Sequence, residues 1–165
     1  MPRDTSTHPE IRLLLTLLDQ GFDRKAWHGP NLHGSLRGLS AEQARWRPAP
    51  GRHSIWELAV HCAYWKQIVR RRISADDERF PRGPADWPAL PESADEAAWQ
   101  ADLRLLRDEH RRLRAAVAAL RTADLHRPAP GQKRPRIEHI RGIAMHDVYR
   151  AGAAAAAADG GMTGV

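Results

Sequence analysis

The residues best equipped for chemistry in this chain are histidines that fall on helical segments. His61 follows Ser54 and Glu57, a capping pattern in which each side chain can bond a free backbone N–H at a helix start. His146 lies on a later segment, in a stripe of residues spaced four and three apart. In a helical bundle, two such side chains from facing helices can meet at one zinc, nickel or iron(II) ion. A metal site is therefore one interpretation, and two histidines packed in the core are the commoner alternative.

The sequence lacks the patterns of several other kinds of site. It has no glycine-rich phosphate loop, no Gly-x-Ser-x-Gly elbow and no cysteine cluster for zinc, and the glutamate–histidine spacing of a di-iron bundle is missing. The single Cys62 excludes an internal disulfide and is typical of a reducing cytosol. Histidine chemistry is what remains, and no catalytic residue is identified by spacing alone.

The positive charge of the chain does not favour a nucleic-acid partner. The 165 residues carry a formal net charge of +6. Only three of the 26 basic residues are lysines, and the arginines are interleaved with Asp and Glu, which is typical of an ion-paired surface. No stretch reaches the ~18 apolar residues of a membrane span, and the first residues lack a signal-peptide pattern. We therefore expect a cytoplasmic protein without a membrane partner.

Apolar periodicity predicts four long helices and no strand. The helices are expected over residues 9–27, 55–73, 93–120 and 137–158. A break is expected at Gly29-Pro30, and the proline-rich residues 74–91 form a long connection. This pattern is that of an all-α four-helix bundle with a long crossover connection between helices 2 and 3.

Shorter signals complete the expected organisation. A capping box at residues 93–96 starts the third helix, and Trp87 is expected to fold back onto the bundle. Residues 159–161, Asp-Gly-Gly, are expected to stop the last helix. We therefore assign residues 1–158 to a single domain and residues 159–165 to a flexible tail.

Four more residues are candidates for a pocket beside the two histidines. His28 flanks the predicted break, and His110 occupies an apolar-seam position of the third helix. Trp65 and Tyr149 stand next to the seams of the second and fourth helices, where they could wall such a pocket. The alternatives are an exposed loop histidine for His28, a buried neutral histidine for His110 and ordinary core aromatics for the other two.

Four stretches together resemble the DinB/YfiT superfamily, and the resemblance runs from the first helix to Gly152. They are Trp27-His-Gly-Pro30, Trp46-Arg-Pro-Ala-Pro-Gly-Arg-His-Ser-Ile-Trp-Glu57, His61-Cys-Ala-Tyr-Trp65 and Gly142-Ile-Ala-Met-His-Asp-Val-Tyr149. The resemblance implies a four-helix bundle, often a homodimer. It also implies a divalent metal such as nickel or zinc, which many members hold through three histidines, one on the second helix and two on the fourth. Some members are thiol S-transferases or related enzymes, so a low-molecular-weight thiol such as bacillithiol, mycothiol or glutathione is an implied cofactor.

The resemblance assigns His61 to the ligand position of the second helix and His146 to the first ligand position of the fourth. Four residues on, where the family has its third histidine, this chain has Arg150. Arginine stays protonated and offers only donors, so it cannot ligate a metal. Three outcomes are open: His28 or His110 supplies the third ligand, two histidines and water hold a metal weakly, or the metal is lost and Arg150 binds an anion. We favour the third.

Two functions follow from the resemblance and its departure. The first is a DinB-like metal-dependent enzyme of the thiol S-transferase or hydrolase type, with an incomplete three-histidine site, in which the metal would lower the pKa of a bound thiol or water. The alternative is a non-catalytic binding or dimerisation module whose metal-free pocket holds a small anionic ligand. The sequence leaves open whether the chain is an enzyme and which substrate it would use.

Overall fold

The structure, a computed structural model, describes residues 8–162, with side chains described as far as residue 160. Over this range the chain forms helices α1 (Pro9–Phe22), α2 (Leu32–Leu36), α3 (Ala41–Arg45), α4 (Ile55–Ser74), α5 (Glu96–Ala118), α6 (Thr122–Leu125) and α7 (Arg136–Met162). Bridged β-structure within the described residues is confined to two isolated pairs, Ala26 with Gly29 and Pro128 with Pro135. The predicted all-α fold is confirmed.

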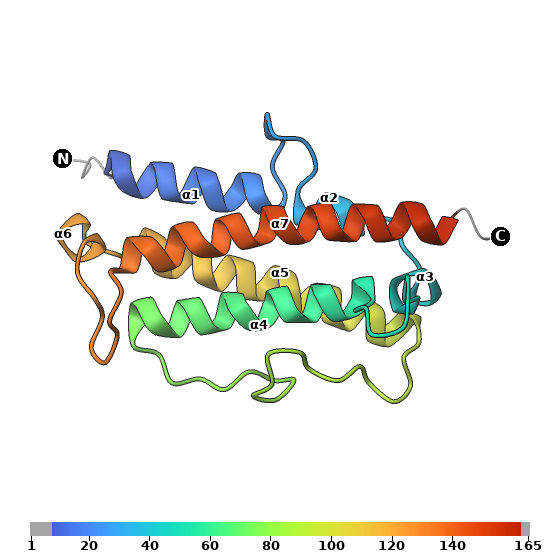
Figure 1. The fold of residues 1–165 in the computed structure, drawn as a ribbon. Helices are drawn as coiled ribbons and strands as arrows, with labels where there is room; N and C mark the ends of the chain where they lie inside the picture. The colour runs from blue at the N-terminus through green and yellow to red at the C-terminus, as the bar shows by residue number, and fades with distance from the viewer. Residues whose placement is uncertain (1–7, 163–165) are drawn as a thin grey trace.

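The long helices α1, α4, α5 and α7 lie side by side (Figure 1). Helix α7 runs along the length of the molecule, with α1 beside its first half and α2 beside its second half. Helix α4 packs against both α5 and α7, and the connection between α4 and α5 follows the outer side of α4. The two helices that carry His61 and His146 are therefore direct neighbours.

Buried apolar side chains form two clusters, one toward each end of the bundle. The cluster at the α2 and α3 end contains Trp56 and Trp99, whose rings lie 5.2 Å apart. Both indole N–H groups are satisfied, since Trp56 donates to Asp102 and Trp99 donates to the Leu39 carbonyl. The other cluster joins aliphatic side chains of α1, α4, α5 and α7. Between the clusters the core is polar.

The connection between α4 and α5 is anchored to the bundle by its side chains. Phe80 is buried, Arg82 forms an ion pair with a carboxylate of α5, and the Tyr64 hydroxyl of α4 donates to a carbonyl of the connection over 3.1 Å. Trp87 packs against the first core cluster, as predicted. These contacts place Asp86 and Trp87 beside α4, in the middle of the molecule.

The end of α1 and the start of α5 differ from those predicted. Helix α1 ends at Phe22 instead of near residue 27, because Asn31 caps α2 and its amide also bonds the Arg24 carbonyl, which holds the intervening residues in a loop. Helix α5 begins one residue after its N-cap Asp95, so the capping box predicted over residues 93–96 is wrong. The Glu96 carboxylate instead accepts a hydrogen bond from the first backbone N–H of α3.

The end of α7 also differs from its prediction. The helix continues to Met162, so residues 159–161 do not stop it. Alanine is the best helix former, and Ala154 and Ala157 of the alanine run are buried in the first core cluster, which extends the helix beyond its expected end. Residues 163–165 of the predicted tail lie outside the described residues.

A buried polar layer lies between the two apolar clusters. Lys66 Nζ donates to Asp147 Oδ2 and lies 3.3 Å from His110 Nδ1, and all three residues are buried. The imidazole of His110 stacks on Phe22 with ring centroids 3.9 Å apart. Burial is the main cause that lowers the pKa of His110 to about 2, followed by the Lys66 charge. His110 is thus a neutral acceptor for the lysine inside the core.

Removal of Lys66 is expected to cost much of the stability of the fold. Lys66→Met leaves the buried Asp147 carboxylate unpaired, which destabilises proteins by about 3–5 kcal/mol. Urea unfolding measures the loss as a change in the free energy of unfolding. The double variant Lys66→Met with Asp147→Leu, which removes both charges, should recover most of the loss. A single variant within about 0.5 kcal/mol of the wild type, the usual range of surface substitutions, would contradict a structural role for the pair.

Candidate functional site

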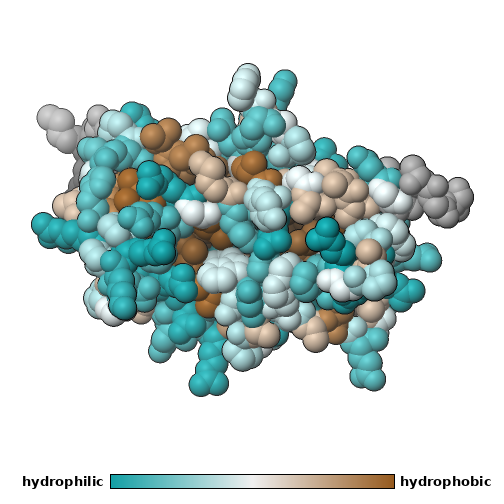
Figure 2. Space-filling view, in the orientation of Figure 1, coloured by the Kyte–Doolittle hydropathy of each residue, from teal (hydrophilic) through white to brown (hydrophobic). Residues whose placement is uncertain are grey.

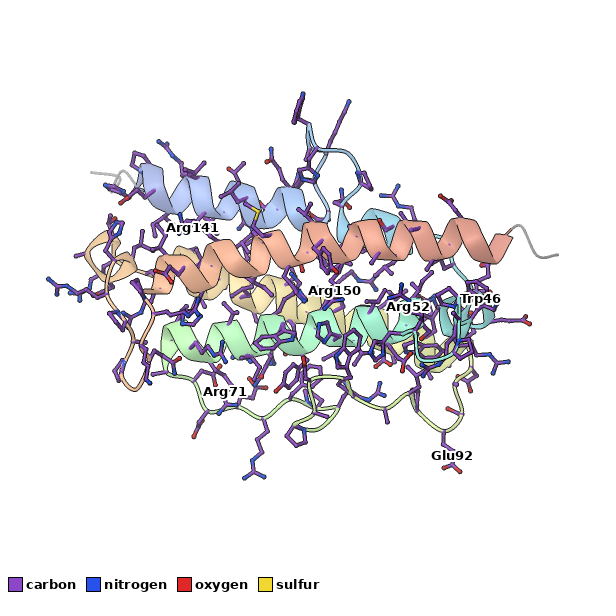
Figure 3. All side chains as sticks on the ribbon, viewed as in Figure 1. Trp46, Arg52, Arg71, Glu92, Arg141 and Arg150 are labelled. Atoms are coloured by element: carbon purple, nitrogen blue, oxygen red, sulfur yellow. The ribbon has the colours of Figure 1, made fainter. Side chains whose placement is uncertain are left out.

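Helices α4 and α7 bring His61, His146 and Arg150 into direct contact. The Nε2 atoms of the two histidines lie 3.2 Å apart. Arg150 Nε donates to His146 Nε2 over 3.3 Å, and Arg150 Nη2 lies 3.2 Å from His61 Nε2. His146 and Arg150 are one helical turn apart on α7, and both contact His61 of α4. Figure 3 shows Arg150 between α7 and α4. One guanidinium therefore bridges two imidazoles.

Residues of the long connection fix the orientation of His61. Its Nδ1 lies 2.8 Å from the Asp86 carbonyl oxygen and 3.1 Å from the Asp86 carboxylate, which are both acceptors. The proton of the neutral imidazole is thereby assigned to Nδ1, and the Nε2 lone pair faces Arg150. The same carboxylate accepts a hydrogen bond from the Trp65 indole over 2.6 Å. Trp87 stacks on the His61 ring at a centroid distance of 3.9 Å.

Both histidines of the pair are held in their neutral form. Burial is the main cause that lowers the pKa of His61, and the Arg150 charge adds to it, while the hydrogen bond to Asp86 opposes it. Burial also lowers the pKa of His146 to about 3, with His61 and Arg150 as the next causes. Neutral imidazoles can accept hydrogen bonds from a guanidinium, so protonation and geometry agree.

A three-histidine metal centre does not fit these residues. Arg150 places its N–H donors in front of the two Nε2 lone pairs that a metal would need at about 2.1 Å. His28 is exposed in the loop after α1, and His110 is bound to Lys66 in the buried polar layer. Neither His28 nor His110 joins the pair, so residues 8–162 place no third imidazole at the position that Arg150 occupies.

A second group of possible ligands lies deeper in the core. Cys62, His146 and Asp147 each offer one atom, and these atoms lie within 4.8 Å of one another. His146 Nδ1 and Asp147 Oδ1 have no hydrogen-bond partner among the described residues. Burial raises the pKa of the Cys62 thiol, however, and the Lys66 ammonium already neutralises the Asp147 carboxylate. Because a cation would have to enter beside that ammonium, we assign no metal to this group.

A cavity of about 560 Å³ opens beside Arg150, between the C-terminal half of α7 and the residues that lead into α4. Three basic side chains line it, Arg52, His53 and Arg150, and no Asp or Glu is among its described lining residues. Figure 3 shows Arg52 and Arg150 on the same side of the molecule, in the space between α4 and α7. The other lining residues are mainly apolar and include several alanines of α7. The cavity is therefore positively charged and largely apolar.

The four predicted pocket residues lie in different places. Tyr149 lines the cavity, and its ring lies 5.1 Å from the Arg150 guanidinium carbon. Trp65 does not line this cavity but lines a different one, to which His146 also contributes. His28 and His110 lie away from the cavity. Sequence reasoning missed Asp86 and the cavity residues Arg52 and His53, although the last two belong to the stretch that carries the family resemblance.

A family model described as the DinB superfamily matches residues 26–154. This chain belongs to the DinB superfamily. The match spans α4 and the part of α7 that carries His146 and Arg150, so the predicted resemblance is confirmed. No curated protein and no solved structure matches this DinB-superfamily chain. Among residues 8–162, none of its helices combines the length and the apolar character needed to cross a membrane.

The His146 imidazole is expected to stay neutral far below the ordinary pKa of histidine. In a pH titration followed by ¹⁵N nuclear magnetic resonance of the imidazole, the wild type should show no protonation of His146 down to about pH 5. Arg150→Gln removes a positive charge but not the burial, so the pKa of His146 should rise only part of the way to 6.5. A wild-type transition of His146 near 6.5 would contradict the burial and contacts described above.

Proposed function

We propose that this DinB-superfamily chain binds a small organic anion at a metal-free centre, in which Arg150 takes the place of the metal. The observation that carries the proposal is the guanidinium that bridges the Nε2 atoms of His61 and His146. A metal ion and a guanidinium both bring positive charge to two imidazole lone pairs. The guanidinium is part of the chain, so the charge is permanent and does not depend on metal supply.

Arg150 keeps hydrogen-bonding capacity for a ligand. A guanidinium has five N–H donors, and the contacts with the two histidines use one donor on Nε and one on Nη2. The cavity that Arg150 lines has no Asp or Glu among its described lining residues, and the guanidinium carbon lies 5.3 Å from the centre of the Trp87 ring. The planar fork of an arginine held in this way matches the two oxygens of a carboxylate. An anion in the cavity would therefore meet oriented donors.

The histidine pair and Cys62 are poorly suited to catalysis. The Nε2 lone pairs of His61 and His146 are both engaged by Arg150, so neither is free to act as a base. The Cys62 thiol is buried and its pKa is raised by that burial, which disfavours the thiolate needed for nucleophilic attack.

A second candidate is the metal-dependent enzyme of the thiol S-transferase or hydrolase type. It is favoured by the 3.2 Å approach of the two Nε2 atoms, which could share a divalent metal such as nickel or zinc if Arg150 turned away. A low-molecular-weight thiol would then be the cofactor expected from the family resemblance. The two candidates differ in metal content, which can be measured directly.

A homodimer in the cytoplasm remains our prediction from the family resemblance and the cysteine usage. Exposed apolar side chains that a partner subunit could cover occur on α1 and α7, namely Leu13, Met145 and Tyr149. In Figure 2, apolar surface is visible along α1 and the adjoining part of α7.

Metal content should separate the two candidates. Wild-type protein purified without chelator is expected to hold far less than one equivalent of nickel or zinc by mass spectrometry. Arg150→His supplies a third imidazole and should raise the affinity for either metal by at least about tenfold, or ~1.4 kcal/mol. The matched control Arg104→His places a histidine on the exposed face of α5 and should leave the affinity unchanged. A stoichiometric metal in the wild type would overturn the metal-free centre.

Anion binding should depend on Arg150. Acetate, titrated against the wild type and followed by backbone amide shifts, is expected to bind at the cavity. Arg150→Gln should weaken binding by about 10–100-fold, because hydrogen bonds to a charged group contribute ~1.5–3 kcal/mol. Arg104→Gln, which removes an exposed arginine of α5, should bind acetate as the wild type does. If Arg150→Gln and Arg104→Gln bind acetate with equal affinity, Arg150 does not bind the anion.

A further inference from the structure

We propose that the anion bound at Arg150 is a monocarboxylic acid with a flat apolar body, such as an arylacetic acid. This inference rests on the anion-binding function proposed above and specifies its ligand. The carboxylate would pair with Arg150, and the apolar body would lie over the alanines of α7. Three features of the cavity lead to this class: its floor, its charge and its size.

The floor of the cavity is made by alanines. Ala153, Ala156 and Ala157 line it, directly after Arg150 on the same helix. Side chains of one methyl group leave the helix surface nearly flat, so a planar body can approach the backbone of α7 closely. Figure 2 shows pale to light-brown surface along the C-terminal half of α7, which is the colour of mildly apolar residues. A longer side chain at any of these positions would fill the space that the cavity now offers.

The charge of the cavity favours an anion with one carboxylate next to an apolar part. Arg150 is half-buried and flanked by the rings of Trp87 and Tyr149, whereas Arg52 is exposed at the rim. The third basic side chain, His53, lies 3.6 Å from the Glu57 carboxylate, which compensates any positive charge on it. The half-buried guanidinium of Arg150 thus faces a largely apolar space, and Arg52 adds positive charge at the entrance, which attracts anions.

The size and the walls of the cavity suit a small ring compound. Its volume of about 560 Å³ lies within the range of small-molecule sites, about 300–1,000 Å³. Leu58 and Pro48 add apolar surface to the lining of the cavity. The Trp87 ring already stacks on His53 at 3.5 Å and on His61 at 3.9 Å, so a ligand would rest mainly on the alanine floor. A flat body makes the largest contact with such a floor.

Three probes separate the carboxylate from the apolar body. Isothermal titration and amide shifts would compare phenylacetate, acetate and the neutral phenylacetamide on the wild-type protein. Phenylacetate should bind at least about tenfold more tightly than acetate, because its ring loses contact with water. It should also bind at least about tenfold more tightly than phenylacetamide, because only the acid forms a charge-assisted pair with Arg150.

Filling the floor tests where the ring lies. Ala153→Leu and Ala156→Leu should each weaken phenylacetate binding by at least about tenfold while acetate binding stays within about twofold of the wild type. Ala156 is exposed, so its substitution is compatible with the fold. Ala115→Leu, a matched change on the exposed face of α5, should alter neither ligand. Unaltered phenylacetate binding by both floor variants would overturn the inference.

The outcomes also distinguish this inference from the function on which it rests. If acetate and phenylacetate bind Arg150 with equal affinity, the anion site stands and the apolar class is wrong. If benzylphosphonate, which has the same ring and methylene linker and is a dianion above its second pKa, binds more tightly than phenylacetate at such a pH, the class is also wrong. If none of the anions binds, or if they bind equally well to Arg150→Gln, the proposed function itself fails.

Discussion

The contact between α4 and α7 depends on a guanidinium that is held between two neutral imidazoles. Two Nε2 atoms that both carry lone pairs repel each other at 3.2 Å unless a donor or a cation lies beside them. Arg150 supplies the donors and the positive charge together. Burial keeps both histidines neutral, and the Arg150 charge adds to that effect. The positive charge beside the cavity and the exclusion of a metal from the two lone pairs follow from the position of the guanidinium.

The rest of the fold supports the arrangement from two sides. On the outer side, the connection between α4 and α5 supplies Asp86 to orient His61 and Trp87 to cover it. On the inner side, Lys66 and Asp147 form a neutralised pair that fills the middle of the core. A second cation in the core would be repelled by the Lys66 ammonium, whereas the Arg150 guanidinium lines the cavity outside that layer. The alanine run then leaves that cavity open next to the charge.

Regular elements could be predicted from the sequence, whereas the surroundings of the site could not. The capping box of Ser54 and Glu57 forms as predicted, because it depends only on side chains three residues apart. The meeting of His61 and His146 came from the family resemblance, since their spacing alone also allowed a packed core. Glu96 shows the limit of local reasoning, because its carboxylate bonds α3 across the fold instead of capping its own helix. Asp86 lies in a proline-rich connection without periodicity, and its position depends on anchors such as Arg82 that no local pattern reveals.

The most direct test of the account is a crystal structure of the protein grown with excess nickel, with anomalous data collected at the nickel edge. We expect guanidinium density between the two imidazole rings and no anomalous peak within bonding distance of either Nε2 atom. An anomalous peak about 2.1 Å from the Nε2 atoms of His61 and His146, with Arg150 turned away, would contradict the claim that arginine replaces the metal.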